Sequence, residues 1–497
     1  MATIDLTQLL LPYGNRTLKV KATGTGFDDS DWSNTVTYAC LPVLKKKDAS
    51  TLTISNTRAA CTTYTLYNKN NTALDTVSFS GSDGDEIDVD VTNFGFTQDA
   101  YNDIYCIASD GNDTFTSATF KFWYGSNIIL GVSGLYNSTT ALTRTDAAVG
   151  KTWTMTSNEI TSDFDTLFPF NEMVKETVDG NAMVYVPEMY WRLGYDSNGR
   201  LTDIAVAPEE ITTLGSGQVS AHSDAFYYGA YGGSWSSDTL KSASGVARQY
   251  SKTRAQFRTA AQANGTGYQI IDVLHTRILE MLWLIEFADK QSENIMWGYT
   301  NYGGNCGATD TLTAPSGQLA NQGRMRWRYI EDFIGNGYEI IDGITGLYVT
   351  ADPSQYGDTQ VGTSYTGTSI NGYELAALQS PDANNPLLLV PKEGVNNGSY
   401  NTYFCDYVNN PAGNYMIYRG RNYSNVSNGL FYWNAFVVSF SNYNIGSRHL
   451  ILETFIRIYK YFSVAICPYH SVKNISQKAR SSRCSCIRKT VRELKVK

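Results

Sequence analysis

Only one stretch of this 497-residue chain has strong helical periodicity. Residues 274–288 read LHTRILEMLWLIEFA. Apolar side chains recur there at helical spacing and form one stripe, made of Leu274, Ile278, Met281, Leu282, Ile285 and Ala288. Arg277 and Glu280 fall on the other side. The spacing predicts a helix that serves as core scaffold, and we expect a second helix in the segment before Gly298.

The rest of the chain has the texture of short strands joined by turns and long loops. It is 42% hydrophobic and only 17% charged, with 42 Gly, 12 Pro and 35 Tyr. This balance favours strands and turns over long helices and disfavours a coiled coil or a chain disordered throughout. Because single cores stop growing near about 250–300 residues, the length predicts several domains.

Two β-rich segments come first. Residues 18–38 alternate on both sides of a Gly/Asp turn, which predicts a hairpin. It resembles the last strands of fibronectin- or immunoglobulin-like repeats in phage tail proteins, so residues 1–45 are expected to form a partial β element. Residues 46–125 are expected to form an immunoglobulin-like β-sandwich, a spacer in preference to a carbohydrate-binding module. Its expected strands are TLTIS, CTTYTLY, EIDVDV, DIYCIA and ATFKFWY.

The cysteines and histidines point to no metal or redox chemistry. Eight cysteines are too few for a disulfide scaffold of this length, and none form a C-x-x-C motif. Cys61 and Cys106 have the separation of an immunoglobulin inter-sheet pair, but buried free thiols are the favoured reading. The four histidines are dispersed. We expect no metal and no cofactor.

Charge divides the chain into an acidic body and a basic tail. Residues 456–497 contain 11 Lys or Arg and one acidic residue, whereas the whole chain carries −8. The acidic body predicts no nucleic-acid partner. The tail is expected to be a solvated, mostly disordered extension, although contact with an acidic partner or nucleic acid is the other reading. No secretion signal is readable, and charges interrupt the apolar stretch 449–469, so no membrane insertion is expected.

Seven segments after residue 126 follow one known pattern, in order. They are LTRTDAAVG, FDTLFPFNEM, GNAMVYVPEMYWR, FRTAAQANGTGYQ, the apolar helix, RYIEDFIGNGYEIIDG and GLFYWNAFVVSFSNYNIGSRHLI. Together they resemble the C-type lectin domains of phage tail proteins, including those diversified by retroelements. The branch of formylglycine-generating enzymes shares the motif at residues 331–343. The resemblance implies an α+β C-type lectin domain over residues 126–455.

The motif RYIEDFIGNGYEIIDG is expected to be core. Its glycines permit turns that side chains would obstruct, and its apolar residues supply buried surface. Four acids in it could be imagined as a metal or acid/base cluster, but solvated or backbone-capping roles are favoured. They are Glu331, Asp332, Glu339 and Asp342.

Residues 415–450 contain the expected variable region. Residues 419–444 are rich in Tyr, Ser and Asn, as binding loops are, because Tyr gives contact area and Ser and Asn adapt their hydrogen bonds. In diversified members of the resembled family this stretch varies by mutation of adenines in AAC codons. The residues expected to be displayed as ligand-binding surface are Tyr423, Asn425, Val426, Asn428, Tyr432, Asn434, Phe436, Val437, Ser439, Phe440, Asn442 and Tyr443. The residues expected to be fixed scaffold are Gly429, Trp433, Ile445, Gly446 and Arg448.

A buried strand is the competing reading of this region, with Phe436, Val437, Val438 and Phe440 in the core. Display is favoured because FVVSF does not alternate cleanly and lies in a polar background. A cluster of exposed Phe, Val and Tyr with a polar rim would have the anatomy of a protein-contact surface.

Two enzymatic or metal-dependent readings are disfavoured. Calcium-dependent lectins use a Trp-Asn-Asp triplet, whereas Ala435 follows Trp433 and Asn434 here. Formylglycine-generating enzymes use a late cysteine pair, whereas this chain offers Cys405 with Cys306 far upstream. We therefore expect a binder that is not an enzyme.

The expected function is that of a phage tail adhesin, located in the virion, which binds a protein or glycan receptor on the host cell. Other tail proteins are expected partners, and homo-oligomerisation is left open. The alternatives are a bacterial surface adhesin of the same fold, a structural baseplate component and, least favoured, a formylglycine-generating-type enzyme.

Overall fold

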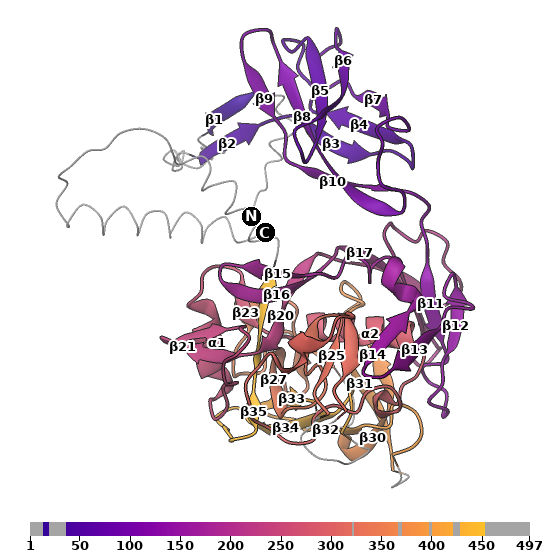
Figure 1. The fold of residues 1–497 in the computed structure, drawn as a ribbon, viewed down its shortest axis with the longest axis vertical. Coiled ribbons are helices and arrows are strands. Elements are labelled where there is room, and N and C mark those ends of the chain that lie inside the picture. Colours follow the sequence, from indigo (N-terminus) through magenta and orange to yellow (C-terminus); the bar gives the residue numbers. More distant parts are fainter. Residues whose placement is uncertain are drawn as a thin grey trace, which may run out of the picture. The chain divides into compact units, whose positions relative to one another are not determined.

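The computed structural model describes residues 13–18, 36–320, 323–365, 370–396, 400–420 and 428–452. Most of its regular structure is β-strand, in several sheets (Figure 1). The α-helices within those residues are α1 (Arg254–Gln262) and α2 (Val273–Phe287). No helix among them is long and apolar enough to cross a membrane. The basic tail lies outside the described residues.

Strand β1 (Gly14–Leu18) pairs antiparallel with β2 (Val36–Cys40). The hairpin predicted for residues 18–38 lies mostly outside the described residues, which include only its two ends. The expected strands of residues 46–125 are present. One sheet has the order β3 (Val43–Lys46), β4 (Thr51–Ser55), β7 (Ile87–Asp90). A second has the order β10 (Phe120–Tyr124), β8 (Ala100–Ser109), β5 (Thr63–Asn68), β6 (Ala73–Ser78), with β9 (Thr114–Thr116) paired to β8.

Alternating residues of these two sheets form one core. Tyr64 and Leu66 on β5 are buried with Leu52 on β4, since successive side chains of a strand point to opposite faces. Cys61 and Cys106 belong to the same cluster, and both thiols are free. The favoured reading of these cysteines as small buried residues is confirmed.

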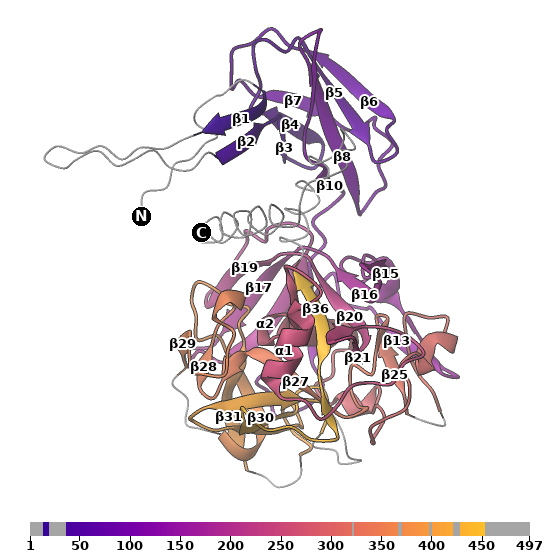
Figure 2. The ribbon, with the colours of Figure 1, turned by 90° about the vertical axis from the view of Figure 1, so that its left-hand side faces the viewer.

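After residue 126 the strands form several further sheets (Figure 2). One runs β12 (Thr143–Asp146), β11 (Leu130–Ser133), β18 (Leu201–Ala207), β17 (Met189–Tyr195), β19 (Gln218–Ser223). A second runs β15 (Lys175–Val178), β16 (Asn181–Val186), β20 (Phe226–Gly232), β36 (Arg448–Leu452), β23 (Tyr268–Ile270). A third runs β13 (Trp153–Thr156), β14 (Glu159–Ser162), β24 (Ser316–Gln318), β25 (Met325–Trp327), β26 (Ile330–Glu331). A short hairpin joins β21 (Ser234–Ser236) to β22 (Thr239–Lys241).

The largest sheet contains the segment expected to vary. Its order is β29 (Thr363–Ser364), β28 (Tyr348–Val349), β27 (Tyr338–Thr345), β33 (Tyr415–Arg419), β34 (Trp433–Val437), β32 (Tyr407–Asn410), β30 (Ile370–Gln379), β31 (Val390–Val395). Strand β35 (Ile445–Gly446) adds to it by parallel pairing with β27. The core motif and the variable region therefore share one sheet.

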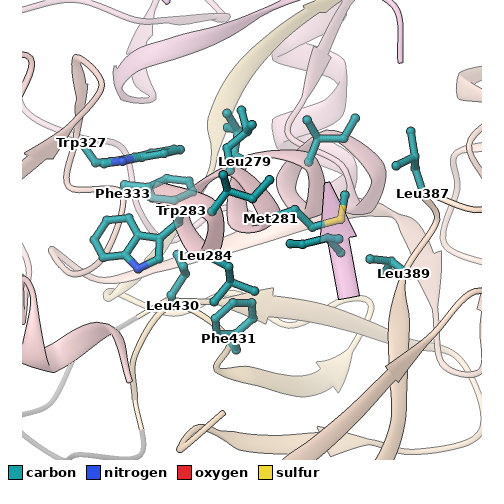
Figure 3. Packing of buried hydrophobic residues seen from close by; sticks show 14 of the residues in the cluster. Leu279, Met281, Trp283, Leu284, Trp327, Phe333, Leu387, Leu389, Leu430 and Phe431 are labelled. Carbon is teal, nitrogen blue, oxygen red and sulfur yellow. The ribbon is translucent and has the colours of Figure 1, made fainter. Parts of the chain in front are cut away.

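Helix α2 confirms the apolar-helix prediction. The Asp272 side chain caps its first turn by accepting from the His275 N–H at 2.8 Å, and Ala288 ends it in a left-handed conformation. Its apolar side chains, including Leu279 and Trp283, lie in the principal cluster of buried residues (Figure 3). Arg277 and Glu280 are also buried and pair with each other. The helix is core scaffold, as expected.

The second helix lies elsewhere than expected. The segment before Gly298 contains a single 3-10 turn, Ser292–Asn294. The helix that does form, α1, begins with a capping box between Thr253 and Gln256. It falls in the FRTAAQ segment, whose helical potential the sequence reading did not use. Other 3-10 turns are Asp163–Thr166, Ala308–Thr311 and Pro353–Gln355.

The acids of the core motif are buried, so the solvated role is wrong for them. The backbone-capping role is confirmed for Glu331, whose carboxylate accepts from the N–H groups of Gly307 and Thr309, both at 2.8 Å. Glu331 and Asp332 both pair with Arg324, at 2.7 and 2.6 Å. Asp342 pairs with Arg258 at 2.6 Å. Buried carboxylates need such partners because burial penalises an unpaired charge.

Glu339 is the most heavily paired of these acids. Its carboxylate lies 2.9 Å from Arg248, 2.9 Å from Arg448 and 3.4 Å from Arg419. Burial by itself would raise the pKa of Glu339, but the three guanidinium groups outweigh it and hold the pKa below its ordinary value. Glu339 is thus an ionised hub inside the protein.

Glu339→Gln should lower the free energy of unfolding by about 3–5 kcal/mol, because it leaves three buried guanidinium groups without their shared carboxylate. Urea denaturation followed by circular dichroism measures the change. Glu176→Gln is the control, since Glu176 is exposed. A Glu339 variant as stable as the control would contradict the assigned role.

His449 should contribute to acid instability. Burial, with a smaller effect of Lys241, lowers the pKa of His449 to about 3 in the folded state. The unfolded chain takes up this proton near pH ~6.5, so stability is lost as pH falls below that value. Between about pH 7.5 and 5, wild type should lose about 2 kcal/mol more than His449→Gln. Equal losses in urea denaturation at the two pH values would refute this assignment.

Candidate functional site

The candidate site is built on the strand pair β33–β34. Arg419 lies opposite Trp433 at the buried start of the pair, and Tyr415 lies opposite Val437 at its end. Along β34 the side chains pass from the buried Trp433 to the exposed Phe436 and Val437. One strand therefore links the core to the surface.

Residues expected to be scaffold are all buried. The Arg277 guanidinium lies 4.0 Å from the centre of the Trp433 ring. A Cβ atom on Gly429 would lie 2.4 Å from Ser292 Oγ, and one on Gly446 would lie 2.7 Å from a backbone oxygen. Ile445 aligns with Tyr338 in the parallel β35–β27 pair. Close packing leaves little room for other side chains at these positions.

Arg448 links this scaffold to the core motif. Besides its contact with Glu339, its guanidinium donates to the carbonyl oxygens of Gly229, Glu331 and Asp332 at 2.9, 2.8 and 3.2 Å. These bonds connect β36 to the turn at the start of the core motif. Arg448 is therefore a structural residue.

Several residues expected on the surface are found there. The exposed fraction is 38% for Phe436, 49% for Val437 and 57% for Tyr443, and Ser439 is also exposed. Asn434, Phe440 and Asn442 are half-buried. The reading of Phe436 and Val437 as core residues does not hold, because β34 ends at Val437 and the chain turns, with the Phe440 N–H donating to the Val437 carbonyl at 2.8 Å.

Asn428 and Tyr432 are buried, so the expectation of surface display is wrong for both. The Tyr432 ring stacks on Tyr338 and Tyr407, with centroid distances of 5.4 and 5.7 Å. Its hydroxyl accepts from the Asn434 amide at 2.9 Å. Tyr423, Asn425 and Val426 lie outside the described residues.

An aromatic column joins the buried rings to the displayed ones. We use this name for Tyr338, Tyr432, Tyr418, Phe436 and Phe440. Tyr338 and Tyr418 are 5.0 Å apart, Tyr418 and Phe436 are 5.6 Å apart, and Phe436 and Phe440 are 3.9 Å apart. Burial raises the pKa of both Tyr418 and Tyr432, so their phenols stay neutral. The column supports the exposed rings without placing a charge beneath them.

Asp406 anchors the chain just before β34 and was missed by the sequence analysis. Its buried carboxylate accepts from the backbone N–H groups of Gly429 and Phe431, the latter at 2.7 Å. Ser292 Oγ accepts from the Leu430 N–H at 3.0 Å. No sequence signal marks these long-range contacts, because the partners lie at least 23 residues away.

The two cysteines of the enzymatic reading are buried thiols. Burial raises the pKa of Cys306 to about 11, and it also raises the pKa of Cys405. Cys306 Sγ is 3.4 Å from the Gly232 carbonyl oxygen, to which it donates. Thiolates are the reactive form of cysteine, so these surroundings work against nucleophilic chemistry.

The described residues contain no group of three or more His, Cys, Asp or Glu placed to hold a metal ion. Asn434, the amide of the Trp-Asn-Ala triplet, uses its side-chain oxygen to accept from Asn409 at 2.9 Å and from the Ala435 N–H at 2.8 Å. The side chains that the described part of this region exposes are aromatic, aliphatic, hydroxyl and amide groups.

Truncation should destabilise the protein much more at Tyr432 than at Tyr443. Tyr432→Ala should lower the free energy of unfolding by about 3–5 kcal/mol, because it removes a buried ring from the aromatic column. Tyr443→Ala should change it by only about 0.5 kcal/mol, because Tyr443 is exposed. Urea denaturation of both variants decides this; similar losses would mean that the two positions are not scaffold and display.

Comparisons with known proteins leave the family open. No family model matches the sequence, and no curated protein matches it. A solved structure described as that of PvdO from Pseudomonas aeruginosa is similar to this chain at 13% identity and a TM-score of 0.27. The match covers 56% of this chain and 97% of that one. A TM-score of this size carries no argument, so fold and function rest on the residues described above.

Proposed function

We propose that the protein is a phage tail adhesin that recognises a host-cell receptor through the exposed residues around the end of β34. The observation that carries this proposal is the division within residues 428–448 between buried, closely packed positions and exposed ones. Stability resides in the first set, and specificity resides in the second. Recognition occurs by contact, without a catalytic step.

The exposed set suits macromolecular contact. Phe436, Val437 and Tyr443 provide apolar area, and Ser439 and Asn442 provide polar groups around it. Aromatic centres with polar surroundings are typical of protein-binding patches. Several copies on a virion would strengthen adsorption through effective concentration.

We propose a C-type lectin fold of the α+β class for residues 126–455. Its support is the ordered set of resembling segments, the complete burial of residues 330–346, and the position of α2 within the core. The N-terminal β-sandwich serves as a spacer in this proposal, and the domain division suggested by the sequence is retained.

Diversification by a retroelement would exploit the same division. Mutation at the first two bases of an AAC codon never yields Lys, Gln, Glu, Met or Trp, and residues 422–428 and 434–444 contain none of these five. Trp433 cannot arise in this way, and it is buried.

Three other functions remain alternatives. A bacterial surface adhesin would present the same residues from a cell instead of a virion. A structural baseplate component would not use them for adsorption. A formylglycine-generating-type enzyme would need reactive cysteines, and the burial of Cys306 and Cys405 counts against it.

Deep sequencing of the gene from a mixed population tests the proposal. Substitutions should concentrate in the codons of Phe436, Val437, Ser439 and Tyr443, while those of Gly429, Trp433 and Gly446 stay fixed, because only the first set can change without disturbing packing. Tyr432 is a matched control for Tyr443, since the same residue type is buried there. Variation no greater than in residues 257–269 would overturn the claim of diversification.

A further inference from the structure

A second segment, residues 297–303, lies against the core motif and also contacts Tyr443. We call the exposed residues Phe436, Val437, Ser439 and Tyr443 the display surface. Tyr299 forms a parallel bridge with Gly335, and the Asn336 N–H donates to the Tyr299 carbonyl at 2.9 Å. A Cβ atom on Gly298 would lie 2.3 Å from the Ile334 carbonyl oxygen. The backbone of this segment is therefore fixed by close contact with the core.

Gly337 is the point at which three distant segments meet. Its φ is +84°, and a Cβ atom there would lie 2.7 Å from the Asn444 carbonyl oxygen, 2.9 Å from the Tyr250 ring and 3.4 Å from Tyr302 Cβ. A side chain would force these three segments apart. The glycine of the core motif thus brings Tyr250 and Tyr302 to the variable region.

The result is a second set of aromatic contacts. Tyr302 packs against Tyr443 with a centroid distance of 5.1 Å and against Tyr250 with one of 5.8 Å. The Tyr250 hydroxyl donates to the Asn336 carbonyl at 3.0 Å and accepts from the Gly303 N–H at 3.2 Å. Tyr302 itself is 37% exposed. An exposed ring on a fixed backbone therefore adjoins the most exposed tyrosine of the variable region.

We propose that Tyr302 is a constant part of the ligand-binding surface, and that this surface takes an uncharged, apolar patch of a polypeptide. The inference rests on the proposed function and extends its site beyond the variable region. Tyr302 contributes a contact that is common to all variants, whereas the residues at positions 436–443 adjust the fit.

Among the described residues, the two segments that form this surface carry few charges, which favours an uncharged ligand. Residues 428–447 include no Lys, Arg, Asp or Glu. Lys252 is close by, since the N–H of its neighbour Ser251 donates to the Asn442 carbonyl at 3.0 Å, but its ammonium lies 5.1 Å from the centre of the Trp235 ring. The nearby Arg419 and Arg248 are buried and paired with Glu339. A charged ligand group would lose hydration there without gaining a partner, which is unfavourable.

The ring geometry favours a polypeptide over a glycan. Sugars bind aromatic residues by stacking on an open ring face. Phe436 already stacks on Tyr418 at an interplanar angle of 10° and on Phe440 at 23°. These two parallel neighbours leave less of its ring face open for a sugar, and the exposed Val437 side chain follows it on the strand. Edges and methyl groups suit aromatic and aliphatic side chains.

A random peptide library panned against the immobilised full chain tests the proposal. Selected peptides should be uncharged and rich in aromatic and aliphatic residues, and their affinity should change less than about twofold between ~0.05 and ~0.5 M salt. Phe436→Ala and Tyr302→Ala should each weaken binding by about tenfold or more. Val149→Ser is the control, since Val149 is 65% exposed on the loop after β12, and it should leave binding unchanged.

Two further variants of Tyr302 distinguish a lost contact from a misfolded protein. Tyr302→Phe should retain binding because the ring supplies the contact, whereas Tyr302→Lys should abolish it by placing a charge on the surface.

If Phe436→Ala weakens binding and the Tyr302 variants do not, the assignment of Tyr302 fails and the proposed function stands. If selected peptides ignore both positions, the display surface itself is refuted. Selection of charged, salt-sensitive peptides, or binding to neutral glycans on an array instead of peptides, overturns the ligand class.

Discussion

The buried carboxylate of Glu339 is the interaction on which the larger part of the structure depends. It lies among the guanidinium groups of Arg248, Arg419 and Arg448, which come from segments far apart in the sequence. Arg419 also approaches Glu280 on α2, at 3.4 Å. An ionised group in the interior is tolerated only when its partners are present, so these segments must assemble together. The network therefore determines the register of the central sheet and of the strand that follows the variable region.

This constraint also holds the backbone on either side of the exposed residues. Arg419 lies opposite Trp433, and Arg448 follows β35, so the chain is held on both sides of residues 434–444. Between these points Ala435 and Asn444 are buried, whereas Val437, Ser439 and Tyr443 are exposed and have few packing requirements to satisfy. Asp406 fixes the preceding backbone through main-chain N–H groups, which are present whatever the side chains are.

Local pattern was enough to predict much of the fold. The apolar helix, five strands of the N-terminal sandwich and the burial of the core motif follow from periodicity, turn residues and glycine. The scaffold positions were predicted from the family resemblance instead. The ion pairs between residues far apart in the sequence could not be predicted, because no local pattern links Glu339 to its three arginines. The burial of Tyr432 was missed for the same reason, since its stacking partners Tyr338 and Tyr407 lie on other strands. Tyr302 lay outside the stretch whose composition suggested binding.

The 3.9 Å stack between Phe436 and Phe440 has a consequence for how the surface can evolve. Because the two rings pack directly against each other, replacing one changes which residues are acceptable at the other. The two positions are epistatic, and they sample fewer useful combinations than two independent sites would. If the proposed diversification occurs, the repertoire of this surface would be smaller than its number of exposed positions implies, and it would be enriched in pairs of residues that are compatible with each other.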